Sequence, residues 1–175
     1  LTANTQPAIM TASIAAFRVL ERDMGVTLSP AYGAGHSLGE YTALVASGAL
    51  AFRDAVSLVQ KRGQWMQDSA PEGVGAMAAI MGLEPDEIIA ACAEAAPDGE
   101  CQAANFNSPG QVVISGEAVY VDKAIKIMQA RGAKKAVMLN VSAPFHSRLM
   151  KDAAEKLKAQ FEAYSWSEPK WPIVA

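Results

Sequence analysis

One short stretch constrains the fold more than any other: Gly35-His36-Ser37-Leu38-Gly39-Glu40, called the serine turn below. A short run of mostly small residues precedes it, and the helix-compatible run Leu38–Ala46 follows it and stops before Gly48. A serine between two glycines, at a passage from strand to helix, is typical of a sharp turn that exposes the serine hydroxyl. We expect a Cβ at position 35 or 39 to crowd the neighbouring backbone, so that glycine is needed at both.

The serine of this turn is a candidate nucleophile. A helix that begins directly after Ser37 directs free backbone N–H groups toward an oxyanion formed there. The alternative is that the two glycines and the serine form an ordinary tight turn without chemistry, because such pentapeptides are common. Other residues of the chain must decide between the two interpretations.

Composition narrows the class of protein. The 175 residues are 51% hydrophobic and 19% charged, which is typical of a globular chain. A net charge of −3, without a basic block, argues against a nucleic-acid partner, and no apolar run is long enough to predict a membrane span. Cys92 and Cys101 form no C-x-x-C pair and the chain has only two histidines, so we expect free thiols, a reducing cytoplasm and no metal.

The middle of the chain has its own pattern. Pro71-Glu72-Gly73 marks a boundary, and beyond it strands and helices alternate on a small scale. The predicted order is β-α-β-β-α-β, with strands at 76–81, 101–106, 112–115 and 135–141 and helices at 85–95 and 119–131. This order predicts a ferredoxin-like subdomain at 73–139, inserted into a core formed by 1–72 and 140–175. A turn is expected at Asn107–Gly110.

The outer parts predict a first helix over 6–24, with Pro7 in its first turn, and a final approach to a strand at Trp171–Ala175. The predicted class is therefore α/β. Both ends of the chain read as interruptions of longer elements, so we expect the parallel-sheet core to be incomplete at both ends.

Arg62 is the second informative residue. The predicted helix 52–69 has an apolar stripe into which Arg62 falls, formed by Ala55, Leu58, Val59, Gly63 and Met66. A guanidinium on an inward helix face is costly unless an anion meets it. Either Arg62 forms an internal salt bridge or extends to solvent, or its planar fork receives a substrate carboxylate.

A serine hydroxyl needs a base, which is most often histidine. His36 is adjacent to Ser37 in the turn and should project away from the hydroxyl. His146, in a loop before the last helix, is therefore the candidate base, although a histidine at a helix start can also be without function. No acidic residue stands out as the partner that orients its ring, and a backbone carbonyl could serve instead.

Taken together, these stretches resemble the malonyl-CoA:acyl-carrier-protein transacylase family of acyltransferases. The similar features are ordered along nearly the whole chain: Gln6-Pro7-Ala8, residues 35–41, Arg62, Gly75-Ala76-Met77-Ala78-Ala79, Asn105 to Gly116, and Pro144-Phe145-His146. The resemblance implies an α/β-hydrolase-like core with the inserted ferredoxin-like subdomain. It also implies that malonyl-CoA acylates Ser37, which then passes malonyl to the phosphopantetheine thiol of acyl carrier protein in fatty-acid biosynthesis.

The resemblance assigns roles to individual residues. His146 matches the base, Arg62 the ligand of the malonyl carboxylate, and the Leu38 N–H half of the oxyanion hole. Leu38 and Phe145 are bulky, as in family members that prefer malonyl to methylmalonyl groups, and the resemblance implies the same preference here. Further positions match the substrate and the coenzyme A or pantetheine arm: Asn105, Asn107, Lys134 and Lys135.

Two family elements lie outside these residues. A glutamine of the oxyanion hole would precede Leu1, and the carbonyl partner of the histidine would follow Ala175. A protein limited to these 175 residues is thus expected to be inactive. No cofactor is expected besides malonyl-CoA as substrate, and a monomer in the cytoplasm is expected.

The alternatives are a serine thioesterase or esterase, a polyketide-synthase acyltransferase domain, and a non-catalytic module that binds carrier protein. Arg62 and the inserted subdomain favour transfer over hydrolysis, because docking of an acceptor needs a surface and the cleft must exclude water from the acyl-enzyme. The non-catalytic module is less favoured, because the serine, the arginine and the histidine are all present.

Overall fold

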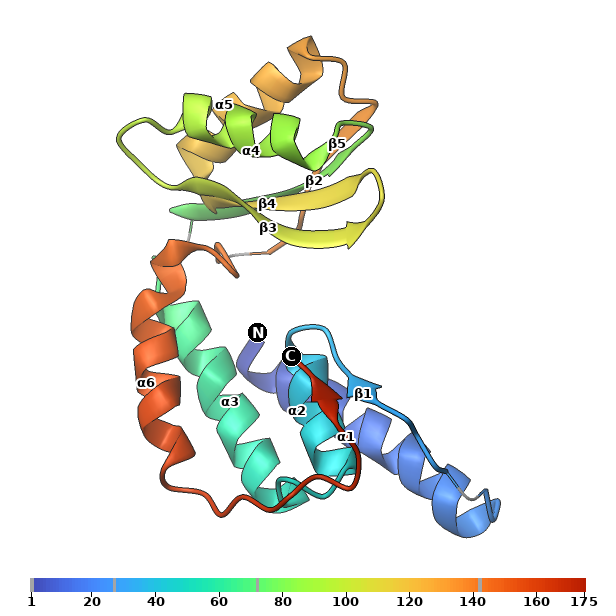
Figure 1. The fold of residues 1–175 in the computed structure, drawn as a ribbon. Helices are drawn as coiled ribbons and strands as arrows, with labels where there is room; N and C mark the ends of the chain where they lie inside the picture. Colours follow the sequence, from blue (N-terminus) through green and yellow to red (C-terminus); the bar gives the residue numbers. More distant parts are fainter. Residues whose placement is uncertain (1, 27, 72, 142) are drawn as a thin grey trace. The chain divides into compact units, whose positions relative to one another are not determined.

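The computed structural model describes residues 2–26, 28–71, 73–141 and 143–175. The chain packs into two compact units, unit 1 from Leu1–Trp65 with Glu155–Ala175, and unit 2 from Met66–Ala154 (Figure 1). The boundaries predicted from the sequence, after 72 and after 139, followed changes of pattern rather than packing. By packing, residues 140–154, which include His146, belong to unit 2.

Unit 1 is built from helices around one apolar core. Its helices are α1 (Thr2–Arg18), extended by a π-helical turn at Val19–Asp23, α2 (Leu38–Ala46), and the larger parts of α3 (Phe52–Asp68) and α6 (Lys151–Phe161). The core residues come from α1, α2 and α3 and the turn after α2: Met10, Ile14, Tyr41, Val45, Leu50, Ala55, Leu58 and Val59. Leu157 and Phe161 of α6 pack against this cluster.

The first helix differs from the prediction. It begins at Thr2 rather than at Gln6, so Pro7 lies inside the helix and not in its first turn. A proline at this position leaves the helix without one i→i−4 hydrogen bond, because proline has no backbone N–H. Met10 and Ile14 of this segment are buried, whereas Ile9 is 53% and Leu20 41% exposed.

A short parallel sheet immediately precedes the serine turn. Strand β1 (Gly33–Ala34) pairs in parallel with β6 (Ile173–Val174), in the register Gly33 to Ile173. The predicted strand near the end of the chain is therefore present, although only two residues long. With unit 2, this parallel pair confirms the predicted mixed α/β class.

Unit 2 contains a four-stranded antiparallel sheet. Its strands are β2 (Gly75–Met81), β3 (Cys101–Ser108), β4 (Gln111–Glu117) and β5 (Lys135–Met138), in the spatial order β3-β4-β2-β5. Helices α4 (Pro85–Ala95) and α5 (Ala118–Ala130) complete the β-α-β-β-α-β order that the sequence pattern indicated. None of the helices in the described ranges is long and apolar enough to span a membrane.

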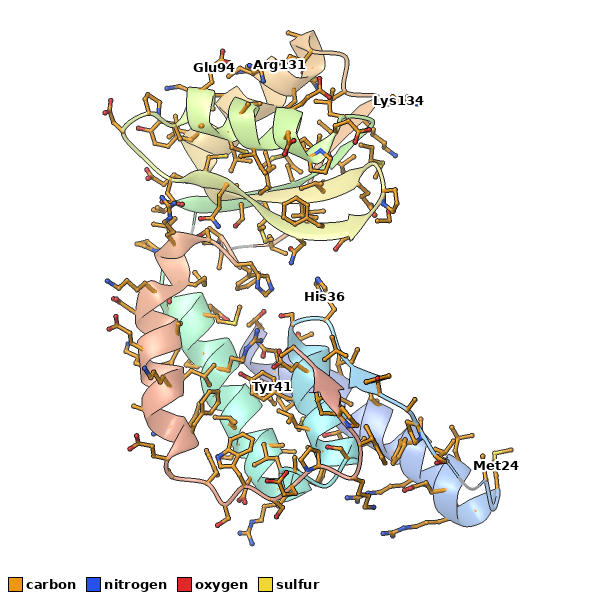
Figure 2. The ribbon with its side chains drawn as sticks, viewed as in Figure 1. Met24, His36, Tyr41, Glu94, Arg131 and Lys134 are labelled. Carbon is orange, nitrogen blue, oxygen red and sulfur yellow. The ribbon has the colours of Figure 1, made fainter. Side chains whose placement is uncertain are left out.

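The two faces of this sheet carry different side chains, as the alternation of a strand requires. Helices α4 and α5 cover one face (Figure 1), where Ala76, Ala78 and Ile80 of β2 lie in the main core of the unit. An ion pair between Glu94 of α4 and Arg131 joins these helices at their exposed ends (Figure 2). Residues of the other face form a second cluster, into which Phe145 packs: Met77, Ala79, Val113 and Leu139.

The turn between β3 and β4 is shorter than predicted. Strand β3 continues to Ser108, so only Pro109 and Gly110 form the turn. Gly110 has φ 74°, a left-handed conformation that glycine adopts without strain. Asn107 therefore lies in a strand rather than in the turn.

Candidate active site

The serine turn holds Ser37 in a strained conformation. Its φ of 53° and ψ of −105° lie outside the regions that residues with a side chain ordinarily occupy. Such strain persists only where the surroundings hold it, and it is concentrated at functional sites. Strand β1 ends just before this turn and α2 begins immediately after Ser37, which is the strand-turn-helix context expected of an exposed serine.

Of the two flanking glycines, one is required by direct contact. A Cβ on Gly35 would lie 1.9 Å from the carbonyl carbon of Gly39 and 2.3 Å from the backbone nitrogen of Glu40. A Cβ on Gly39 would meet nothing within 4 Å. The expectation that both positions need glycine is therefore wrong for Gly39. Only Gly35 is crowded, because it packs against the backbone of Gly39 and Glu40, which follow the serine.

The start of α2 provides the electrostatics of the turn. The Gly39 N–H donates to the His36 carbonyl at 2.9 Å, and the Glu40 N–H donates to the Ser37 carbonyl at 3.3 Å. These bonds close the first turn, while the Leu38 N–H stands at the positive end of the helix. A negative charge that develops beside Ser37 would be stabilised there.

Arg62 of α3 contacts the serine directly. Its Nη2 donates to Ser37 Oγ at 3.0 Å, and its Nη1 donates to Gln6 Oε1 at 2.6 Å. Its guanidinium carbon also lies 5.4 Å from the centre of the Tyr41 ring, within cation–π range. In the part of the chain that the structure describes, Arg62 thus contacts an amide, a hydroxyl and a ring. The salt-bridge alternative has no carboxylate within ion-pair distance there.

Burial shifts the pKa values of both Arg62 and Tyr41. It lowers the pKa of the Arg62 guanidinium, and attraction to Tyr41 opposes that change. It raises the pKa of the Tyr41 hydroxyl, and the positive charge of Arg62 opposes that change. An arginine remains protonated in proteins, so the result is a partly desolvated cation next to a serine. Such a cation binds an incoming anion more strongly than one in water does.

Sequence reasoning identified Arg62 but gave no role to Gln6 or Tyr41. Gln6 is only 7% exposed and lies four residues before Met10, on the same helix face. The available signal was a polar residue, Gln6, on a helix face whose other residues, such as Met10, are apolar. Gly63 explains how Gln6 reaches the site, since a Cβ there would lie 2.7 Å from Ala3 Cα. Helices α1 and α3 therefore approach closely at this point.

His36 lies as expected from its position in the turn. Figure 2 shows its side chain projecting from the serine turn, away from the helices of unit 1, whereas Tyr41 lies among those helices. His36 is exposed. This orientation agrees with its exclusion as the base for Ser37.

His146 belongs to unit 2, and Ser37 to unit 1, so each is described within its own unit. His146 has φ 60°, the second non-glycine residue with a left-handed backbone among those described. Pro144, two residues earlier, is buried, and a Cβ on Gly75 would lie 2.2 Å from its Cδ. The Ser147 Oγ donates to the Pro144 carbonyl at 2.7 Å. A compact, strained turn therefore carries the candidate base.

The remaining candidates lie on the sheet of unit 2. Asn105 and Asn107 are on the edge strand β3, and Lys134 and Lys135 are at the start of the opposite edge strand, β5. The cross-strand register aligns Ser108, Gln111, Met81 and Lys135, so Asn107 and Lys135 lie near the same end of the sheet. Three strand spacings separate the two edges, roughly 14 Å.

The two cysteines form a thiol pair in unit 2. Both are free, Cys92 buried on α4 and Cys101 partly buried at the start of β3. A hydrogen bond with Cys101, together with burial, raises the pKa of the Cys92 thiol. The same hydrogen bond lowers the pKa of Cys101, and burial opposes the change.

The fold and the site together define an α/β protein. Its serine turn holds a strained serine, and a partly desolvated arginine lies beside that serine. The family model for the acyl transferase domain matches residues 1–175. The malonyl CoA-acyl carrier protein transacylase of Escherichia coli K12 is 50% identical over 170 residues, which are 97% of this chain and 54% of the relative.

Solved structures of proteins with related names also resemble this chain. The malonyl CoA-acyl carrier protein transacylase of Coxiella burnetii has a TM-score of 0.95 and 47% identity, over 99% of this chain and 54% of that one. A malonyl-transacylase in complex with a type II polyketide-synthase acyl-carrier protein has a TM-score of 0.95 and 46% identity, over 99% of this chain and 55% of that one. The chain belongs to the acyl transferase domain family. It spans about half the length of the relatives it matches.

Proposed function

We propose that this chain carries the nucleophile, the base and the carboxylate receptor of a malonyl-CoA:acyl-carrier-protein transacylase. The observation that carries the proposal is the hydrogen bond from Arg62 Nη2 to Ser37 Oγ, 3.0 Å long. A cation that touches the nucleophile, and whose other partners Gln6 and Tyr41 are neutral, suits an acyl group that ends in a carboxylate. The names of the relatives, malonyl CoA-acyl carrier protein transacylase, support the same substrate.

In the first half-reaction, Ser37 attacks the thioester carbonyl of malonyl-CoA while His146 takes the hydroxyl proton. The carbon–sulfur bond then breaks, and His146 returns the proton to the departing sulfur of coenzyme A. We assign the Leu38 N–H, at the start of α2, the role of donor to the oxyanion between these steps. The product is a malonyl ester of Ser37.

In the second half-reaction, the phosphopantetheine thiol of acyl carrier protein gives its proton to His146. Its sulfur attacks the ester carbonyl, the carbon–oxygen bond to Ser37 breaks, and the proton returns to the serine. The two substrates therefore alternate at one serine, which predicts ping-pong kinetics. The malonyl-transacylase that was solved with an acyl-carrier protein supports this acceptor.

Selectivity follows from the charge of Arg62. An acyl group without a carboxylate would leave the guanidinium without an anionic partner, at a cost of about 1.5–3 kcal/mol, or about ten- to a hundredfold in rate. We assign Leu38 and Phe145 the role of limiting the size of the acyl group. Leu38 packs on the core of unit 1 and Phe145 on the sheet of unit 2, so neither is free to give way easily.

The carrier arm is assigned to the sheet of unit 2. Asn105 and Asn107 offer amide groups along β3, and Lys134 and Lys135 offer positive charge for phosphate. Both lysines are exposed, as a contact with coenzyme A requires. The enzyme is proposed to act as a monomer, and two free cysteines support a reducing compartment such as the cytoplasm.

Mass spectrometry of the full-length protein tests the proposal. After mixing with malonyl-CoA, we expect a lasting malonyl adduct on Ser37, which acyl carrier protein then removes. Prompt loss of the adduct to water would favour a thioesterase instead. Absence of an adduct, with the protein folded, would favour a module that only binds carrier protein.

A further inference from the structure

The side-chain amide of Gln102 ties the turn of His146 to strand β3. Gln102 Nε2 donates to the His146 carbonyl oxygen at 3.4 Å, and Gln102 Oε1 accepts from the Arg148 N–H at 3.2 Å. One planar group therefore holds the backbone on both sides of Ser147. A peptide group of a neighbouring strand would make the same two contacts.

The turn needs such a tie because His146 is strained. A left-handed conformation costs a residue with a side chain about 1–3 kcal/mol and persists only where other contacts impose it. Pro144, buried against Gly75, fixes the chain before His146. On the other side, Gln102 of β3 bonds the backbone of the turn, and Arg148 forms an ion pair with Glu100, just before β3.

The ion pair is the weaker of these ties. Arg148 Nη1 lies 3.9 Å from Glu100 Oε2, and the arginine side chain is 85% exposed, so solvent screens the attraction. Gln102 projects from the face of β3 opposite to Cys101 and Ala103, which pack toward the core. The amide of Gln102 is a directional contact on this face.

We propose that Gln102 is a positioning residue for His146, whose backbone it holds in the left-handed conformation that fixes the direction of the imidazole. The inference rests on the proposed role of His146 as the base. It goes beyond that role, because it names the element that aims the base from within unit 2.

The test uses two substitutions in the full-length protein. Gln102→Met keeps the length of the side chain but removes both hydrogen bonds. Gln102→Glu keeps the acceptor for Arg148, and it can donate to the His146 carbonyl only while its carboxyl is protonated. Gln129, exposed on α5 of the same unit, receives the same two substitutions as a matched control.

The readout is the rate at which malonyl-CoA acylates Ser37, followed by rapid-quench mass spectrometry and normalised to the folded fraction. For Gln102→Met we expect a rate about ten- to a hundredfold below wild type, with little change in KM, because the base is misdirected. For Gln102→Glu the rate relative to wild type should fall as pH rises through the titration of the new carboxyl. Both Gln129 variants should follow wild type at every pH.

Equal rates for Gln102→Met and Gln129→Met would overturn the inference, and so would a pH-independent ratio for Gln102→Glu. Failure of the proposed function looks different. In that case wild type forms no adduct on Ser37, or His146→Ala forms it as fast as wild type does. The Glu variant at low pH keeps the test decisive if the Met variant does not fold.

Discussion

Arg62 Nη2 donates a hydrogen bond to Ser37 Oγ, 3.0 Å away, so within unit 1 a cation and not a base is bonded to the serine hydroxyl. The contact joins α3 to the serine turn. A carboxylate that arrives beside Ser37 can take over this N–H and form a charge-assisted hydrogen bond with it. Substrate binding would then release the serine oxygen for attack, which links recognition of the acyl group to exposure of the nucleophile.

The first prediction concerns Arg62. Arg62→Ala should lower kcat/KM for malonyl-CoA about ten- to over a hundredfold and raise relative activity on acetyl-CoA, because the proposed carboxylate receptor is lost. Steady-state transfer assays with both thioesters measure this ratio. Arg53→Ala is the matched control, since Arg53 is exposed on the same helix. Unchanged malonyl kinetics in Arg62→Ala would remove Arg62 from the site.

The second prediction concerns Gln6, which holds Arg62 through a 2.6 Å hydrogen bond. Gln6→Met keeps the length of the side chain but leaves a buried guanidinium N–H without its acceptor. We expect kcat/KM for malonyl-CoA to fall about tenfold, less than for Arg62→Ala. Gln60→Met, at an exposed position of α3, serves as the control. If Gln6→Met transfers malonyl as fast as this control does, then Gln6 does not position the arginine.

The third prediction separates the two glycines of the serine turn. Gly35→Ala should lower the free energy of unfolding by at least about 2 kcal/mol, because its Cβ would overlap the backbone of Gly39. Gly39→Ala should leave stability unchanged or raise it by up to about 1 kcal/mol, as expected for alanine in an open helix position. Urea unfolding of both variants provides the comparison. Equal losses would contradict the one-sided crowding.

The fourth prediction concerns the thiol pair and pH. Because the hydrogen bond with Cys92 lowers the pKa of Cys101, Cys101 should carry thiolate at lower pH than an ordinary cysteine. Iodoacetamide should therefore label Cys101 before Cys92, whose pKa is raised. In Cys92→Ala the pH midpoint for labelling of Cys101 should move upward. Peptide mass spectrometry follows both sites, and a midpoint that stays in place would show that the thiols do not interact.

Local signals in the sequence predicted much of the fold. Helix α4 lies where expected, because Pro85 stands in its first turn and the Glu84 and Glu87 side chains cap its start. The helix-compatible run before Gly48 placed α2, and periodicity placed Arg62 on the inward face of α3. The start of α1 was missed, because proline is most common in the first helical turn, whereas here Pro7 lies one turn further along.

The contacts around the candidate site were harder to predict from the sequence. The contact of Gln6 with Arg62 depends on how α1 packs on α3, and the contact of Gln102 with the turn of His146 joins segments far apart in sequence. Neither follows from periodicity, which reports the buried face of an element but not the element that covers it. The open space at Gly39 was missed for the same reason, since a spacing of glycines does not say which of them the backbone crowds.

The division of the chain has a consequence for its synthesis. Unit 2 is one continuous segment, whereas unit 1 needs residues 155–175 to pack α6 on its core and to pair β6 with β1. A nascent chain can therefore complete unit 2 while unit 1 still lacks a strand and a helix. Strand β1, which leads into the serine turn, is among the last elements to gain its pairing partner, although the ribosome makes it early.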